Sequence, residues 1–134
     1  MAGSDIIIEG LDEAEQALTK FIERTYPEEF EKMVISMAHD LKAAVQDKTP
    51  VDTQWLQDHW FVGDIVKKGN GYYIEVYNNE EYVEPVEFGH RTSTGGYVEG
   101  AHMMEVSIET LKVMLPSYLR DWLSTLLNRL ELEL

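Results

Sequence analysis

The stretch Lys48–Trp60 constrains the fold more than any other part of the chain, because the sequence pattern changes there. Before it, apolar residues recur with the period of a helix. After it, β-branched and aromatic residues are separated by turn residues. Pro50 disfavours the α region for the residue before it, so we expect a long helix to end near Asp47. The chain should therefore consist of a helical part, a corner and a sheet.

The same stretch carries the residues that would fix such a corner. Asp52 and Thr53 can each accept a backbone N–H and close a local turn. Trp55, Leu56 and Trp60 are large and apolar, and they fall close enough together to pin the helix to the sheet. A plain helix-to-strand corner with no further role is the simpler interpretation of these residue types.

Two helical segments are predicted before the corner. Asp12 and Glu15 form a capping-box pattern that begins a first helix over 12–24. Pro27 suits the first turn of a second helix. We interpret the apolar stripe of that second segment as core: Phe30, Met33, Val34, Met37, Ala38, Leu41, Ala44 and Val45. Two separate helices and one long helix kinked at Pro27 both fit this pattern.

A small antiparallel sheet is predicted after the corner. Strands over 61–66 and 72–77 are separated by Asn70-Gly71, the strongest short-range signal for a hairpin. The segment 82–88 fits either a helical turn or a strand, although Pro85 excludes a central strand position.

Residues 89–100 form the stretch with the least predicted structure, since Gly, Ser and Thr dominate it without periodicity. A loop of this length in a compact domain is usually functional or disordered, so we expect it to be mobile. From about Ala101 a helical period resumes, and Pro116 should kink or divide this helix near Leu115. Its apolar face consists of Met104, Ile108, Leu111, Leu115, Tyr118, Leu119, Trp122, Leu126 and Leu130, widened by Leu123 and Leu127.

These elements predict a single domain, 1–134, of the α+β class. It should consist of a long N-terminal helix, kinked or broken at Pro27, and a small, mostly antiparallel sheet with a β-hairpin. A mobile loop over 89–100 and a long C-terminal helix packed back on the first complete it. The run Ile6–Ile8 favours a further short strand near the N-terminus.

The net charge of −14, from 25 acidic and 11 basic residues, argues against nucleic-acid binding, because phosphate backbones would repel such a chain. The acidity either keeps the protein soluble or lines a passage through which DNA slides without binding. Because copies with this charge repel one another, we expect the isolated protein to be a monomer or a weak oligomer. The sequence contains no cysteine, no apolar run long enough to cross a membrane and no basic N-terminal region typical of a signal peptide.

Candidates for catalysis or metal binding are few and scattered: Asp52, Asp58, His59, Glu84, Glu87, His90 and His102. Their spacing matches no common metal-binding motif. Glu84 and Glu87 would face one way on a helix, but no nucleophile or base accompanies them. Residues 89–100 lack the lysine of a phosphate-binding loop. We therefore predict no enzymatic activity, no metal and no cofactor.

Three motifs, in order along the chain, resemble the tail-completion family of long-tailed bacteriophages, small minor tail components at the head–tail joint. The first is K-T-P-V-D-T-x-x-L-x-x-x-W at Lys48–Trp60, similar to that family's P-V-D-T-G-x-L-R-x-S turn. The second is Y-V-E-P-V-E-F-G-H at Tyr82–His90, and the third is Y-V-E-G-A-H-M-M-E-V-S at Tyr97–Ser107. The chain departs from the family pattern, which has Gly, Arg and Ser, at Gln54, Gln57 and His59.

The resemblance implies a virion protein, made in the bacterial host cytoplasm, that completes the tail and joins it to the head connector. Its copies would form a ring, sixfold by resemblance, that contacts the tail-tube and head-closure proteins and lets DNA pass without specific binding or membrane contact. It implies structural roles for Pro50, Val51, Asp52, Thr53, Leu56, Trp60, Tyr82, Glu87, Phe88 and Gly89. It implies assembly contacts for His90, Arg91, Thr92, Tyr97, Val98 and His102.

Two other functions stay open from the residues alone. The first is a small acidic regulatory module that binds a partner through an exposed Met/Leu helix face, which dimerisation through the 108–130 stripe would favour. The second is a metal-dependent hydrolase, which requires the His and Asp residues to converge.

Overall fold

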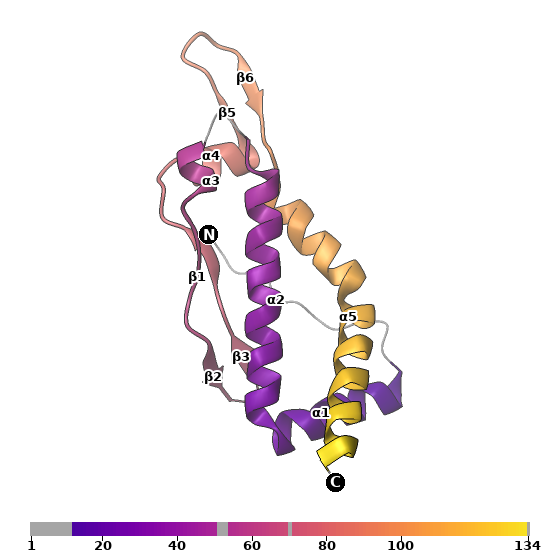
Figure 1. Ribbon diagram of the computed structural model, residues 1–134. Coiled ribbons are helices and arrows are strands. Elements are labelled where there is room, and N and C mark those ends of the chain that lie inside the picture. The colour runs from indigo at the N-terminus through magenta and orange to yellow at the C-terminus, as the bar shows by residue number, and fades with distance from the viewer. Residues whose placement is uncertain (1–11, 51–53, 70, 134) are drawn as a thin grey trace.

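The computed structural model describes residues 12–50, 54–69 and 71–133. The predictions for the strand at Ile6–Ile8, for the turn at Asp52 and Thr53, and for Val51 and Asn70 fall outside these ranges. The fold is α+β, as predicted. Its elements follow the order α1 (Glu13–Thr25), α2 (Pro27–Lys48), α3 (Gln54–Gln57), β1 (Trp60–Val62), β2 (Val66–Lys68), β3 (Gly71–Tyr73), β4 (Val76–Asn78), α4 (Val83–Phe88), β5 (Gly89–Arg91), β6 (Tyr97–Glu99) and α5 (Met103–Glu133) (Figure 1).

The N-terminal part consists of two helices, because the chain turns sharply at Tyr26. Asp12 and Glu15 form the predicted capping box at the start of α1. The Tyr26 N–H donates to the Ile22 carbonyl and ends α1, and Pro27 then begins α2. Figure 1 shows α1 running at a steep angle to α2 from its lower end, so the kinked-helix alternative does not apply. α2 ends at Lys48, close to the predicted position, and Thr49 is extended.

The C-terminal helix α5 passes through Pro116 without interruption. Pro116 therefore does not divide the helix, although Figure 1 shows the axis of α5 bending along its length. Leu115, Leu119, Leu123 and Leu126 are buried. The predicted core face of α5 is confirmed except at Leu127, whose side chain is exposed. No described helix combines the length and the apolar composition that crossing a membrane requires.

Three clusters of buried side chains hold α5 against the rest of the fold. Near the end of α1, Ile22 packs with Leu123 and Leu126. In the middle, Phe30 and Met33 of α2 pack with Leu115 and Leu119. At the other end of α2 lies the third cluster, which consists of Val45, Leu56, Trp60, Met103 and Met104. The corner residues Leu56 and Trp60 thus join α2 to both β1 and α5, as the sequence predicted for an anchor.

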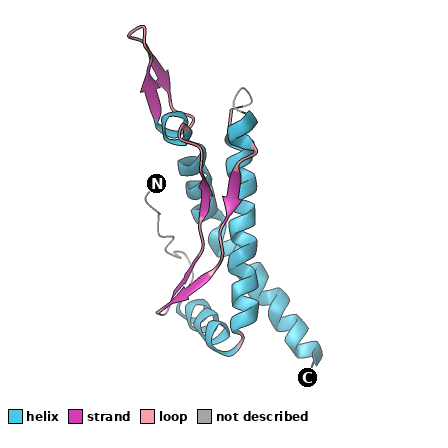
Figure 2. Ribbon diagram, turned by 90° about the vertical axis from the view of Figure 1, so that its left-hand side faces the viewer, coloured by secondary structure: helices cyan, strands magenta, loops and turns pink. Residues whose placement is uncertain are grey.

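The predicted hairpin forms, but each of its strands is interrupted. β1 pairs with β4 and β2 pairs with β3, both antiparallel, in one ribbon that runs alongside α2 (Figure 2). Between the two pairs the Gly63 N–H still donates to the Glu75 carbonyl at 2.8 Å. The prediction of continuous strands over 61–66 and 72–77 is therefore wrong for their middle residues, which lie between β1 and β2 and between β3 and β4.

The prediction of an unstructured stretch over 89–100 is also wrong. β5 and β6 pair antiparallel within it, with Gly89 opposite Glu99, His90 opposite Val98 and Arg91 opposite Tyr97. The preceding segment 83–88 is the helix α4, which settles the alternative between a helical turn and a strand.

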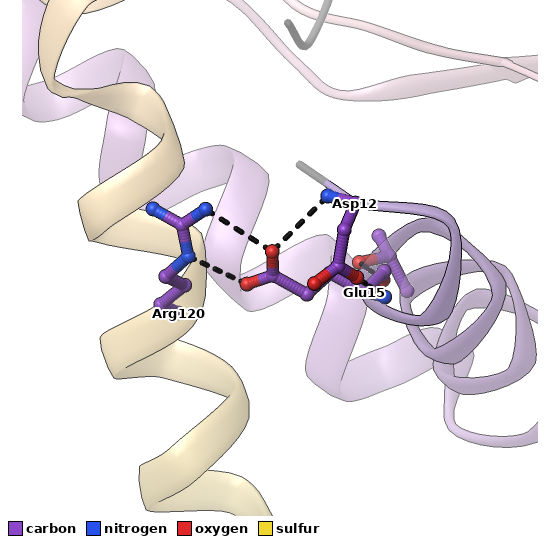
Figure 3. Close-up of polar contacts among 4 residues, drawn as sticks. Asp12, Glu15 and Arg120 are labelled. Carbon is purple, nitrogen blue, oxygen red and sulfur yellow. Dashed lines mark hydrogen bonds and ion pairs between the residues drawn. The ribbon is translucent and has the colours of Figure 1, made fainter. Parts of the chain in front are cut away.

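An ion pair ties the first turn of α1 to α5. The Arg120 guanidinium donates from Nε to Glu15 Oε2 at 2.6 Å and from Nη2 to Glu15 Oε1 at 3.1 Å (Figure 3). The Asp12 backbone N–H also donates to Glu15. These hydrogen bonds, first from Arg120 and then from Asp12, lower the pKa of Glu15. Glu15 thus serves both the cap of α1 and the contact with α5.

The change Arg120→Gln should weaken the fold in a pH-dependent way. Because the pKa of Glu15 is lower in the folded chain than in the unfolded chain, the pair stabilises the fold above the ordinary carboxyl pKa of 4.5. That contribution disappears as the pH falls through the folded pKa. Thermal melts should therefore show a Tm difference between the variant and the wild type at pH 7 that shrinks on acidification. Arg24→Gln in the last turn of α1 is the control, and an equal Tm difference for Arg120→Gln at pH 7 and at pH 3 would contradict the assignment.

Candidate assembly surface

A hairpin projects from the helical body. We call residues 89–99, which comprise β5, β6 and the turn between them, the arm. Figures 1 and 2 show the arm extending beyond the end of α2, away from the helices. Its position follows from α4, which delivers the chain to β5, and from α5, which begins shortly after β6.

The turn of the arm is closed by its own hydrogen bonds. The Thr92 N–H donates to the Gly96 carbonyl at 2.9 Å, and the Gly96 N–H donates to Thr92 Oγ1 at 2.9 Å. Gly95 has a φ of +87°, in a region that strongly favours glycine, and its N–H donates to the Thr92 carbonyl. These contacts shape the tip without help from the rest of the protein.

The arm exposes residue types that are common in interfaces. Tyr97 is 61% exposed and Val98 is 44% exposed, while Phe88, just before the arm, is 54% exposed. The Tyr97 hydroxyl donates to the Phe88 carbonyl, which holds the ring against the root of the arm. Large apolar side chains gathered on an exposed feature are typical of a binding surface.

Arg91 gives the arm a positive charge in an acidic region. It is the only Lys or Arg in the sequence between Lys68 and Lys112. Arg91 and His90 are both exposed. Within the described part of the chain Arg91 forms no ion pair. Its charge is therefore available to a carboxylate on another molecule.

Backbone hydrogen bonds fix the root of the arm. The Ala101 N–H donates to the Val86 carbonyl at 2.8 Å, and the His102 N–H donates to the Glu87 carbonyl at 3.0 Å. Gly100 lies against the backbone of 87–89 so closely that a Cβ at this position would collide with it. The end of α4 and the beginning of α5 are thus clamped together beneath the arm.

Glu87 completes this clamp with its side chain. It is 2% exposed, and its two carboxylate oxygens accept hydrogen bonds from the backbone N–H groups of Met104, at 2.8 Å, and Glu105, at 3.1 Å. These N–H groups belong to the first turn of α5, where a helix has unpaired donors and a partial positive charge. Glu87 therefore caps α5 from the neighbouring helix.

The change Glu87→Gln should destabilise the protein. The amide would turn an N–H₂ donor toward one of the two N–H groups of α5, leaving a buried donor without an acceptor, at a cost of about 1–3 kcal/mol. Urea denaturation would measure the loss. The control is Glu81→Gln, an exposed position just before α4 that should change the free energy of unfolding by less than about 0.5 kcal/mol. Equal stability of the two variants would contradict the capping role.

A second apolar feature lies on the outer side of α5. Val106, Val113 and Met114 are 45%, 80% and 61% exposed, respectively. They line a shallow groove of about 600 Å³. We call it the α5 groove, and its lining residues are His102, Glu105, Val106, Glu109, Thr110, Val113 and Met114. All of them except His102 come from α5, on the side opposite its core face.

Five of the six residues predicted for assembly contacts lie together on the arm, namely His90, Arg91, Thr92, Tyr97 and Val98. His102 lies at the root instead, where its Nδ1 is 2.9 Å from Glu105 Oε2. The exposure of the apolar residues of the α5 groove was not predicted from the sequence. Their signal was a spacing of seven to eight residues, Val106 to Val113 and Met114, about half a turn from the core stripe.

The residues for which the motif resemblance implies a structural role differ in their burial. Leu56, Trp60 and Glu87 are buried, whereas Phe88 and Tyr82 are exposed. Partial burial of the Tyr82 hydroxyl, with a smaller effect of Glu80, raises the pKa of that phenol. Trp55 is 61% exposed, so only Trp60 of the two corner tryptophans is an anchor.

The candidate metal ligands mostly lie apart. His59 stacks on Trp55 and His90 lies near the Pro85 carbonyl. In the described ranges, one set of possible ligand atoms falls within 4.8 Å of one another, from Glu87, His102 and Glu105. Capping accounts for this set, since Glu87 binds the first turn of α5. Glu84 is exposed where Glu87 is buried, so the two carboxylates do not form the predicted pair on one face.

Comparison with known proteins identifies the family. The family model described as "Bacteriophage HK97-gp10, putative tail-component" matches residues 12–89, more than half of the chain, from α1 to the first residue of the arm. No curated protein and no solved structure gives a significant match. The matched range contains the corner at Lys48–Trp60 and nearly all of the Tyr82–His90 motif, which the resemblance had singled out. The chain therefore belongs to the bacteriophage HK97-gp10-like family of tail components.

Proposed function

We propose that this tail component completes the tail and joins it to the head connector as a ring of identical copies. The arm is the observation that carries the proposal. It exposes Tyr97, Val98 and Arg91 on a projecting hairpin, while the core is complete without any arm side chain. An exposed feature of this kind is best explained by contacts with neighbouring virion proteins.

The charge of the chain fits a protein through which DNA passes. Copies that each carry −14 present a surface that repels phosphate, so DNA would slide through a ring without adhering. The motif resemblance gives sixfold symmetry as the expected form and the tail-tube and head-closure proteins as the expected neighbours. The same charge weakens the association of free copies, and contacts within the virion compensate it.

The role is structural and non-enzymatic. A regulatory module that dimerises through the 108–130 stripe has little support, since Leu115, Leu119 and Leu126 of that stripe are buried against α1 and α2. A metal-dependent hydrolase needs histidines that converge, and His59 and His90 lie in separate environments.

A nonsense mutation in the phage gene for this protein tests the proposed role in joining head and tail. If the protein acts at the joint, electron microscopy of lysates should show DNA-filled heads beside separate tails. Adding the purified protein to such a lysate should restore infectious particles. Absence of tails, or tails of irregular length, would instead place the protein in tail assembly. Normal virions would refute a role in the particle.

A further inference from the structure

We propose that the arm of each copy docks in the α5 groove of a neighbouring copy. The inference rests on the proposed ring and names the contact that builds it. The two surfaces are distinct, so the contact is head-to-tail, and such contacts generate rings when the rotation between copies closes.

The apolar parts of the two surfaces match in kind. The arm offers Tyr97 and Val98, and the groove offers Val106, Val113 and Met114, each at least 44% exposed. A valine that is 80% exposed on a helix, as Val113 is, gains nothing for the fold of its own copy. Burying these side chains against one another would remove the apolar surface that both features leave in water.

The charges of the two surfaces are complementary. The arm carries Arg91 and His90, and the groove carries Glu105 and Glu109 on its rim. Because Arg91 is the only Lys or Arg between Lys68 and Lys112 and forms no ion pair within the described ranges, a second copy can supply its carboxylate. Complementary rim charges fix the register of an interface and favour the correct partner.

An arm cannot reach the groove of its own copy. The clamp of Ala101 and His102 on the carbonyls of Val86 and Glu87 fixes the direction in which the arm leaves the root. Figure 1 shows the arm and α5 leaving that root in different directions. Reaching the groove with the arm of the same copy would break the clamp, so an arm that docks there comes from another copy.

Cysteine cross-linking tests the contact directly, because the natural sequence contains no cysteine. Full-length Val98→Cys and Val113→Cys proteins, mixed under mild oxidation, should give a disulfide-linked dimer. The protein carrying both changes should give a ladder of covalent multimers. The control pair is Val98→Cys with Val66→Cys, whose position in β2 is 52% exposed. An Ile7→Cys protein mixed in the same way reports whether the chain's own first residues fill the groove instead.

Charge reversal separates a docking contact from random collision. Arg91→Glu should lower the yield of the Val98–Val113 cross-link up to about fivefold, as loss of one exposed ion pair predicts. Glu109→Arg in the other partner should restore the yield. The proposal is overturned if the control pair cross-links as well as the test pair, if Val113→Cys links mainly to itself or to Ile7→Cys, or if charge reversal has no effect.

The outcome is independent of the head–tail test. Rings in virions without an arm-to-groove cross-link would leave the joining role intact and refute this contact. Cross-linked multimers from a protein whose loss does not separate heads from tails would leave the contact intact and refute the joining role.

Discussion

Replacing Trp60 with alanine should lower the free energy of unfolding by about 3–5 kcal/mol. Trp60 is 1% exposed and packs with Val45, Leu56 and Met103 at the place where α2, β1 and α5 meet. Its Nε1 donates to Thr49 Oγ1 at 3.0 Å, and Thr49 Oγ1 in turn donates to the Val45 carbonyl at 2.7 Å. The change therefore leaves a cavity and takes a donor from a buried hydroxyl.

Trp55→Ala is the matched control for this change. Trp55 is 61% exposed, stacks on His59 and donates from Nε1 to Glu80, so its loss should cost less than about 1 kcal/mol. Urea denaturation with an unchanged m value measures both variants. The loss of stability expected for Trp60→Ala should also lower its Tm by roughly 10–20 °C. If the two variants have similar stability, the corner is not the anchor of the fold.

The sequence predicted the helices well because their ends depend on local chemistry. The capping box of Asp12 and Glu15 begins α1, Pro27 begins α2, and Pro50 follows its end. Each of these signals acts within one turn of the chain, so no tertiary information is needed. However, α5 bends along its length and does not break at Pro116. Whether a proline breaks a helix depends on how the helix packs, here against α1 and α2, and the residues next to the proline carry no information about that packing.

The arm escaped prediction because its strands bury nothing. A half-buried strand shows alternating apolar and polar residues, whereas every residue of β6 is exposed. Only Gly95, which needs a positive φ, and the Thr92–Gly96 hydrogen bonds mark the turn, and they resemble an ordinary loop in the sequence. The residues of a hairpin that packs against nothing in its own chain need not alternate between apolar and polar.

The role of Glu87 depended on contacts between distant parts of the chain. In sequence it lay three residues after Glu84 and suggested a carboxylate pair. In the structure it is buried and caps α5, whose first turn lies on the other side of the arm in sequence. The structure places His90, Arg91, Thr92, Tyr97 and Val98 together on the arm, and their role in assembly contacts stays a prediction.

Deleting Thr92–Gly96 should leave the fold intact and abolish joining. The five residues contact mainly one another, through hydrogen bonds of Thr92, Gly95 and Gly96, so their loss should change Tm by no more than about 2 °C. Arg91 and Tyr97 would then form the turn and could no longer present their side chains to a neighbour. In the phage, we expect filled heads and separate tails with almost no infectious particles.

The same segment should be mobile before assembly and ordered after it. Segments held by exposed hydrogen bonds, without buried apolar contacts, open at little cost in free energy. Amide relaxation of the free protein should therefore give order parameters below about 0.6 across Thr92–Gly96, against about 0.85 in α2. Val66→Ser, an exposed change in the other hairpin, should alter neither Tm nor infectivity. A rigid tip in the free protein, or infectious phage carrying the deletion, would reduce the arm to a connector between α4 and α5.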